Sequence, residues 1–338
     1  VGERDKHVEP GALTDVDEDT MSGVPDDRLR LIFTCCHPAL PLDAQVALAL
    51  RTLTGLSTAE IARALLVSEA TMAQRLVRAK SKIRNAGIPY RVPPARLLPQ
   101  RTNAVLSVLY LLFNEGYSAT GGADFIRDGL TVEAIRLGRL LTTLMPEDCE
   151  VAGLLALMLL HDARQGARLD TAGDLVTLED QDRTRWDSAT IAEAVALLKA
   201  TMERGRPGAY QIQAAIVACH AVAGAAADTD WTQIVALYER LREVAPSPVV
   251  ELNRAVAVAM ADGPDAGLAI VESLADSQAL VDYHLLPAVR ADLLRRLHRV
   301  DEAAVYYRQA LSLAKPDSER RFLQRRLHET TRPQLGQD

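Results

Sequence analysis

The sequence is poor in aromatic residues and in cysteine, and it has no long hydrophobic run. Only four Phe and two Trp occur among 338 residues, which disfavours a protein that holds single-stranded nucleic acid by stacking bases on aromatic rings. The four cysteines indicate no disulfide framework, so we expect a cytoplasmic protein in a reducing compartment. No apolar stretch approaches the length of a membrane span and no secretory signal is visible, so we expect no membrane partner.

A positive net charge is absent as well. The formal net charge is −7, which argues against a protein that coats DNA non-specifically, so any DNA contact must come from a local basic patch. Hydrophobic residues make up 48% and charged residues 25% of the chain, the composition of an ordinary globular protein. The length predicts two domains and a sizeable core.

One local basic patch lies in the stretch from Leu56 to Arg84, which predicts two short helices joined by a tight turn. Ser57 and Glu60 form an S-x-x-E capping box, and Ser68 repeats the N-cap signal eleven residues later. The second helix has a core-facing stripe at the spacing i, i+4, i+7 and i+11, formed by Met72, Leu76, Ala79 and Ile83. Two helices that begin so close together are typical of a helix-turn-helix.

A separate arc of the second helix is polar and basic. Between Ser68 and Arg84 there are five Lys or Arg residues and one Glu, and the arc consists of Thr71, Gln74, Arg75, Arg78 and Lys82. This pattern suits a helix in the major groove of DNA, because Gln and Arg read the edges of adenine and guanine with paired hydrogen bonds. The alternative is a plain helical hairpin whose charged face is solvated. Leu66 counts against the helix-turn-helix, because glycine would be easier in the turn if φ is positive there.

Composition and apolar periodicity divide the chain into five segments, and every element that we predict is a helix. The all-α fold would consist of an acidic linker at 1–25, a helix-turn-helix domain at 26–87, a Pro/Arg linker at 88–101, a helical extension at 102–212, and repeats with a capping helix at 213–330. Further helices are expected at 102–114, 124–145, 147–161, 188–203 and 209–224. The two polar interruptions that follow from this pattern are a loop at Asn114–Tyr117 and a longer one at Asp162–Asp187.

The Cys35-Cys36-His37 sequence invites a zinc interpretation, but no second ligand pair follows at zinc-finger spacing. Adjacent cysteines also point to different sides of a helix. We therefore expect the cysteines to act as small buried hydrophobic residues, and we expect neither a metal nor a cofactor.

The residues from Leu40 to Arg84, LPLDAQVALALRTLTGLSTAEIARALLVSEATMAQRLVRAKSKIR, resemble region 4 of bacterial extracytoplasmic-function sigma factors. Four further motifs, DDRLRLIFTCCHPALP before this stretch and LYLLFNEGYSA, LHDAR and LEDQDRTRWD after it, resemble the subgroup with a long C-terminal extension of tetratricopeptide-like repeats. In that family a further domain, region 2, acts at the −10 promoter element. We expect no counterpart of region 2 in this chain.

The repeats are the second feature of the resemblance. From about Gln213 the chain repeats at a period near 34 residues, and the small-x3-aromatic-x2-small pattern of a tetratricopeptide second helix fits Ala303, Tyr307 and Ala310. The same frame fits Ile234, Tyr238 and Leu241, and more loosely Ala266, Ile270 and Ser273. A strongly charged helix at 317–329 would cap the array. The alternative is a generic α-bundle.

The resemblance implies a subunit that directs core RNA polymerase to double-stranded promoter DNA by binding the −35 element. Arg75 and Gln74 would contact base edges, Arg78 and Lys82 would supply charge to phosphates, and Glu69 would accept from a cytosine amine or stabilise its helix N-terminus. Hydroxyl or backbone N–H contacts to phosphate would come from Ser57, Thr58, Ser68 and Thr71. The extension would be a binding scaffold and not an enzyme, with the repeats offering a site to a regulatory protein or peptide.

Two other functions compete with this one. A one-component regulator would use the repeats to bind a ligand or protein and the helix-turn-helix to bind an operator as a symmetric dimer. An enzyme would rest only on the polar side chains of the two interruptions, where a network that caps helix ends is the more ordinary explanation.

Overall fold

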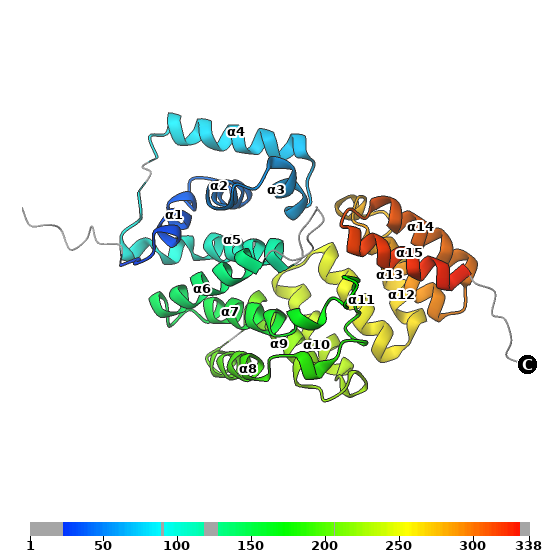
Figure 1. Ribbon diagram of the computed structural model, residues 1–338. Coiled ribbons are helices and arrows are strands. Elements are labelled where there is room, and N and C mark those ends of the chain that lie inside the picture. Colours follow the sequence, from blue (N-terminus) through cyan, green and yellow to red (C-terminus); the bar gives the residue numbers. More distant parts are fainter. Residues whose placement is uncertain (1–22, 89–90, 118–127, 206, 332–338) are drawn as a thin grey trace, which may run out of the picture.

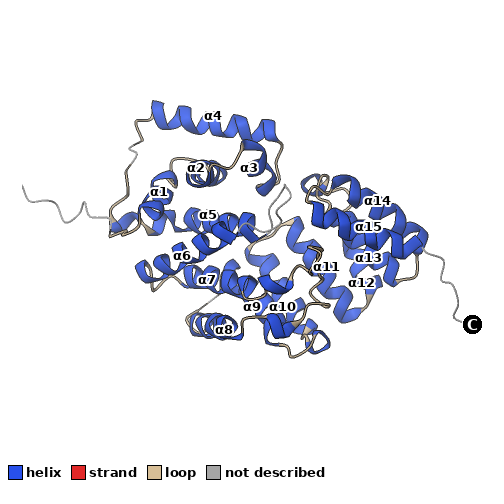
Figure 2. Ribbon diagram, viewed as in Figure 1, coloured by secondary structure: helices blue, strands red, loops and turns tan. Residues whose placement is uncertain are grey.

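The computed structural model describes residues 23–88, 91–117, 128–205 and 207–331. Within these ranges the chain is helical and contains no strand, which confirms the all-α prediction (Figures 1 and 2). No helix in the described ranges is long and apolar enough to cross a membrane. The α-helices of the first half are α1 (Asp27–Cys35), α2 (Leu42–Thr54), α3 (Thr58–Ala64), α4 (Glu69–Asn85), α5 (Pro99–Tyr117), α6 (Asp128–Leu144) and α7 (Cys149–Asp162). Those of the second half are α8 (Ser188–Met202), α9 (Ala209–Val222), α10 (Trp231–Val244), α11 (Pro248–Asp262), α12 (Pro264–Ser273), α13 (Leu285–Arg296), α14 (Val300–Leu313) and α15 (Asp317–Thr331).

The helix-turn-helix is present where the local signals predicted it, and we call residues 23–88 the helix-turn-helix unit. Its capping box is complete, because the Ser57 hydroxyl accepts from the amide of Glu60 while the Glu60 carboxylate accepts from the amide of Ser57. Ser68 caps α4 by accepting from the amide three residues later. Leu66 in the turn has a φ of 52°, so a leucine occupies a conformation that glycine adopts more easily.

The helix-turn-helix unit and the first helices of the extension share one hydrophobic core. A single cluster of packed apolar side chains includes residues from Val24 to Ala214. α2 packs directly against α5, and α5 begins at Pro99, where proline suits the first turn of a helix. The segment at 88–101, which we predicted to be a linker, therefore ends before residue 101, and the units on its two sides pack together.

Polar contacts hold both ends of α1 against the first helices of the extension. Arg101 on α5 is buried, with 8% of its surface exposed, and its Nη1 donates to the carbonyl oxygen of Phe33 at 2.6 Å. Phe33 lies in the last turn of α1, where carbonyl groups lack partners within the helix. Asp26, which caps the start of α1, accepts from Nη1 of Arg136 on α6 at 2.8 Å.

From α9 onward, helices pack as sequence neighbours in a continuous array (Figure 1). α9 packs against α10, α11 against α12, and α13 against α14, and α15 covers the end of the array. In the last of these pairs the residues of the predicted frame, Ala303, Tyr307 and Ala310, are all buried. The predicted capping helix at 317–329 corresponds to α15.

In the pair formed by α11 and α12, the predicted frame of Ala266, Ile270 and Ser273 begins one residue too early. Ser273 is exposed, whereas Gly267 and Val271 are buried between α11 and α12. A Cβ atom at Gly267 would lie 2.5 Å from the Cβ of Ala259 and 2.6 Å from the carbonyl oxygen of Ala255. The small position of this pair is therefore Gly267, because only glycine allows the two backbones to approach so closely.

The long polar interruption at Asp162–Asp187 is confirmed, and it crosses from α7 to the last helices. Asp174 pairs with two arginines of α15, at 2.5 and 3.3 Å. Glu179 pairs with Arg296 on α13 at 3.7 Å. Asp187 ends the segment as the N-cap of α8. Its polar side chains thus connect distant helices and cap their ends.

The shorter predicted interruption, Asn114–Tyr117, is wrong, because these residues complete α5. Aromatic contacts of Tyr117 connect the end of α5 to the longer interruption. The guanidinium carbon of Arg168 lies 3.7 Å from the centre of the Tyr117 ring, and the rings of Tyr117 and His161 are 5.2 Å apart. The two polar segments therefore meet around Tyr117.

Two histidines close to this meeting point are half-buried among arginines. Burial holds the pKa of His161 well below its ordinary value, and Arg164, Arg168 and His220 lower it further. Nη2 of Arg164 donates to Nδ1 of His161 at 3.0 Å. Burial also lowers the pKa of His220 to about 4, with Arg164 and Arg183 as the next causes. Both imidazoles are neutral in the folded protein at pH 7.

We expect acid to destabilise the protein through these imidazoles. The folded pKa of His220 lies below its unfolded value near 6.5, so the unfolded chain binds the extra proton and stability falls as the pH drops from 7 toward 4. From pH 7 to pH 5 the loss from His220 alone is roughly 2 kcal/mol. Urea unfolding at a series of pH values measures this loss. His220→Gln should flatten the profile, exposed His328→Gln should not, and equal profiles for both variants would contradict the assignment.

Candidate DNA interface

The outer face of α4 presents the side chains with the greatest freedom to contact DNA. Gln74, Arg78 and Lys82 are exposed, and none of their side chains makes a hydrogen bond or ion pair with another described residue. The opposite face is fixed in the core by Met72, Leu76 and Ala79. The donors of this outer face are therefore available to a ligand.

The hydroxyl residues that we predicted for phosphate contact lie at the starts of α3 and α4. Ser57 and Ser68 use their hydroxyls as caps, and the Ser68 hydroxyl lies 2.8 Å from that of Thr71. Thr58 is half-buried in the first turn of α3, while Glu69 is exposed in the first turn of α4. Because helix N-termini carry free N–H groups and a partial positive charge, both ends favour anions such as phosphate.

Arg75 differs from the other predicted contacts, because it already has a partner within the protein. Its Nη1 lies 2.7 Å from a carboxylate oxygen of Asp43 at the start of α2, and its side chain is only 33% exposed. The guanidinium is therefore turned toward α2. The pair joins residues 32 positions apart, so the sequence alone gave no signal for it.

Sequence reasoning missed Val77, an apolar residue on the outer face. It is 66% exposed and lies one helical turn after Gln74. The helical period would have identified it, since it falls outside the stripe of Met72, Leu76 and Ala79.

A groove of about 600 Å³ lies between the beginning of α4 and the end of the extension. Figure 1 shows α3 on the side of the helix-turn-helix unit that faces α14 and α15. The wall from the helix-turn-helix unit includes Arg63, Leu66, Ser68 and Glu69, and the wall from the extension includes Val281, Tyr283, Leu285, Lys315 and Glu319. Two residues predicted to contact DNA, Ser68 and Glu69, thus lie beside the extension.

Comparisons with known proteins agree with this geometry. Residues 30–83 match the family Sigma-70, region 4, and residues 101–202 match a family of unknown function (DUF6596). The chain is 48% identical over 302 residues to an uncharacterized protein of Rhizobium meliloti (strain 1021), an alignment that covers 89% of this chain and 71% of the relative. The chain belongs to the family of that rhizobial protein. No solved structure matches it.

The match at 30–83 assigns α1 to α4 to the family Sigma-70, region 4, and it supports a sigma-factor-like protein. The family of unknown function covers α5 to α8. In the sigma-factor-like protein the region 4 domain is therefore joined through a common core to helices whose family has no assigned role.

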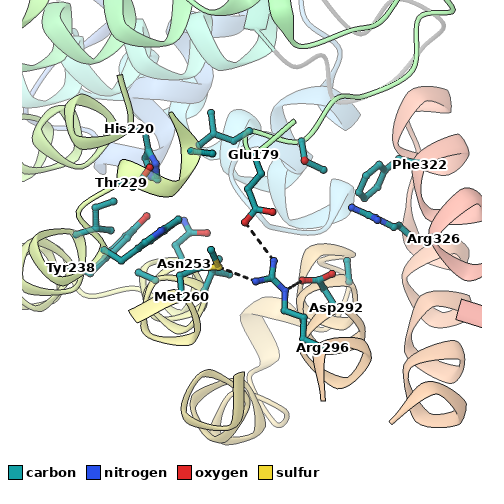
Figure 3. A pocket seen from close by; sticks show the side chains of 18 of the residues that line it. Glu179, His220, Thr229, Tyr238, Asn253, Met260, Asp292, Arg296, Phe322 and Arg326 are labelled. Carbon is teal, nitrogen blue, oxygen red and sulfur yellow. Dashed lines mark hydrogen bonds and ion pairs between the residues drawn. The ribbon is translucent and has the colours of Figure 1, made fainter. Parts of the chain in front are cut away.

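A second cavity, of about 380 Å³, lies within the extension of the sigma-factor-like protein (Figure 3). Arg296 is held there by Asp292 at 2.7 Å and by Glu179 at 3.7 Å, and Figure 3 shows both contacts. Asn253 also faces this cavity, is exposed, and makes no hydrogen bond with another described residue. The amide of Asn253 is thus open to a ligand, whereas the guanidinium of Arg296 is occupied.

The cysteines have the buried role that we predicted near the start of the region 4 domain. Cys35 and Cys36 are fully buried, and burial raises the pKa of the Cys36 thiol far above its ordinary value. Among the residues that the structure describes, no group of three or more His, Cys, Asp or Glu side chains is arranged to hold a metal ion.

Proposed function

We propose that the protein is a sigma factor of the extracytoplasmic-function type, which binds the −35 element of double-stranded promoter DNA and core RNA polymerase. The observation that carries this proposal is the free outer face of α4, with Gln74, Arg78 and Lys82 exposed in a domain that matches region 4. These side chains form a local basic surface on a protein whose net charge is −7. Such a protein binds DNA through one helix and not through its whole surface.

The proposal separates phosphate contacts from base contacts. Lys82→Ala should weaken binding to all duplexes alike and reduce the slope of log affinity against log salt by about 0.9. Gln74→Ala should instead cost about 1–3 kcal/mol on the preferred duplex and relax the preference at one position. Fluorescence anisotropy over a salt series, on duplexes enriched by the full chain from a random pool, measures both effects.

Exposed Lys199 on α8 provides the matched control. Lys199→Ala should change neither the affinity nor the salt slope. If Gln74→Ala and Lys82→Ala cause equal losses on every sequence, Gln74 reads no base.

We further propose that the extension regulates the region 4 domain by contact across the groove beside α4. Leu66 supports this role, because it keeps a large exposed side chain at a φ of 52°, where glycine would remove the strain. Exposed Val281 and Leu285 form the facing wall of the groove. A leucine in this turn therefore offers the extension an apolar side chain across the groove, and the repeats remain our proposed site for a regulatory protein or peptide.

Leu66→Gly separates backbone strain from contact with the extension. The free energy of unfolding should rise by up to about 1–2 kcal/mol, because glycine adopts the left-handed conformation without strain. Residues 278–285 should exchange amide hydrogen faster, and DNA affinity should change. His298→Gly is the matched control, since His298 also has a positive φ, of 60°, but lies in the turn before α14 and outside the groove.

His298→Gly should also raise the free energy of unfolding, because it relieves backbone strain. It should change neither the amide hydrogen exchange of residues 278–285 nor the DNA affinity. Unchanged exchange and affinity in Leu66→Gly would show that the extension does not act through this residue.

The cavity within the extension supports a second candidate function, a one-component regulator that binds a ligand there. Open Asn253 in a cavity of about 380 Å³ is the observation in its favour, since small-molecule sites are usually of this size and have few polar groups. A binding assay separates the two candidates. Binding of core polymerase by the full chain would establish the sigma factor, whereas binding of an operator as a dimer without polymerase would establish the regulator.

A further inference from the structure

The outermost face of α4 is partly apolar, and Val77 is the reason. At 66%, its exposure is the highest among the large hydrophobic side chains of the described chain. Successive residues of an α-helix turn by about 100°, so Val77 lies on the side away from buried Met72, Leu76 and Ala79. One exposed valine on a surface helix is ordinary. Its position among free hydrogen-bonding side chains is the informative feature.

The neighbours of Val77 on this face are polar and uncommitted. Gln74 precedes it by one turn, Arg78 follows it directly, and both are exposed without a partner among the described residues. Arg75, in contrast, is turned aside to Asp43 at 2.7 Å. The strip that would enter the groove therefore consists of Gln74, Val77 and Arg78, with the apolar group beside the two hydrogen-bonding groups.

The major groove contains one apolar group that such a strip can recognise. It is the C5 methyl of thymine, which no other standard base has. Valine presents two methyl groups on a side chain with one strongly preferred rotamer in a helix, so little freedom is lost on contact. We infer that Val77 is a specificity-determining residue that contacts a thymine methyl. The inference rests on the proposed function, because it requires the outer face of α4 to enter the major groove.

The thymine methyl can be removed from the DNA without changing any hydrogen bond, by replacing thymine with uracil. The probe is the duplex that the full chain enriches most from a random pool, with each thymine replaced by uracil in turn. At one position we expect uracil to weaken binding about fourfold, the effect of removing one buried methyl group. Val77→Ala should bind the thymine duplex about fourfold more weakly than the natural chain does. On the uracil duplex the variant and the natural chain should bind equally well. This non-additivity is the signature of direct contact.

Two further variants keep the test specific. Val132→Ala removes a valine of similar exposure on α6 and should leave the affinity and the uracil response unchanged. Arg75→Ala should preserve the uracil response, because Arg75 belongs to the pair with Asp43. Val77→Thr, which keeps one methyl group, should fall between valine and alanine.

Different results would contradict the proposed function and the inference about Val77. If the chain enriches no duplex from the pool, the proposed function fails and the inference fails with it. If a duplex is enriched but Val77→Ala weakens the thymine and uracil forms equally at every position, Val77 contacts something other than a thymine methyl and the inference alone is overturned.

Discussion

Arg101→Ala should lower the free energy of unfolding by about 2–4 kcal/mol, as measured by urea unfolding followed by circular dichroism. The substitution removes the only described hydrogen bond from a side chain to the carbonyl oxygen of Phe33, at 2.6 Å in a buried setting. A buried acceptor left without a partner costs about 1–3 kcal/mol, and the lost side-chain stem adds a cavity. The effect should be cooperative across α1 and α5, because Arg101 joins them within one core.

Arg91→Ala serves as the control, because Arg91 is exposed in the segment before α5. Its effect should stay within about 0.5 kcal/mol, as for most surface substitutions. Arg101→Lys should fall between the two, since lysine keeps the charge but lacks the planar guanidinium. A loss below about 1 kcal/mol for Arg101→Ala, against the range expected for a broken buried hydrogen bond, would mean that the joint does not depend on this contact.

Gly267→Ala should also destabilise the protein, by about 1–3 kcal/mol, through overpacking between α11 and α12. The added Cβ would meet the backbone carbonyl oxygen of Ala255 at 2.6 Å and the Cβ of Ala259 at 2.5 Å. Neither atom can move without shifting α11. Thermal unfolding measures the loss.

Gly129→Ala is the matched control in α6, where an added Cβ would meet nothing within 4 Å. It should stabilise the protein by up to about 1 kcal/mol, because alanine restricts the unfolded chain and favours a helix. Equal and small effects of the two substitutions would show that α11 and α12 can separate without cost.

The elements that the sequence predicted well are those specified by neighbouring residues. Ser57 and Ser68 each cap a helix by accepting from an amide three positions later, so the signal and its result lie within one turn. The helical period in the same way placed Ala303, Tyr307 and Ala310 in the core. Even the reservation about Leu66 was sound, since its φ of 52° is the conformation that made glycine the easier residue there.

The features that the sequence did not reveal depend on residues far apart in the chain. Arg75 and Asp43 are 32 positions apart, and Arg101 and Phe33 are 68 apart. Nothing local distinguishes an arginine that pairs within the protein from one that faces solvent. The segment at 88–101 has the composition of a linker, yet composition cannot show that the helices on its two sides pack against each other.

Of the candidate site, the sequence identified the helix and its free donors but not the direction of every side chain. Gln74, Arg78 and Lys82 are exposed as required, while Arg75 is turned toward α2. The choice of Ala266 as the small position of the middle helix pair, where the structure has Gly267, failed for a related reason. A shift of one residue on a helix changes which side chain faces its partner, and two adjacent small residues leave that choice open.

The common core also sets the order in which the protein can fold while it is being synthesised. α2 ends at Thr54, but α5, which packs over it, is complete only at Tyr117. At about 5–20 residues per second, roughly 3–13 s separate the emergence of these two helices from the ribosome. During that interval the apolar faces that bury Phe33 and Leu50 in the finished protein lack their covering helix. A nascent region 4 domain thus exposes part of its apolar surface until α5 has been synthesised.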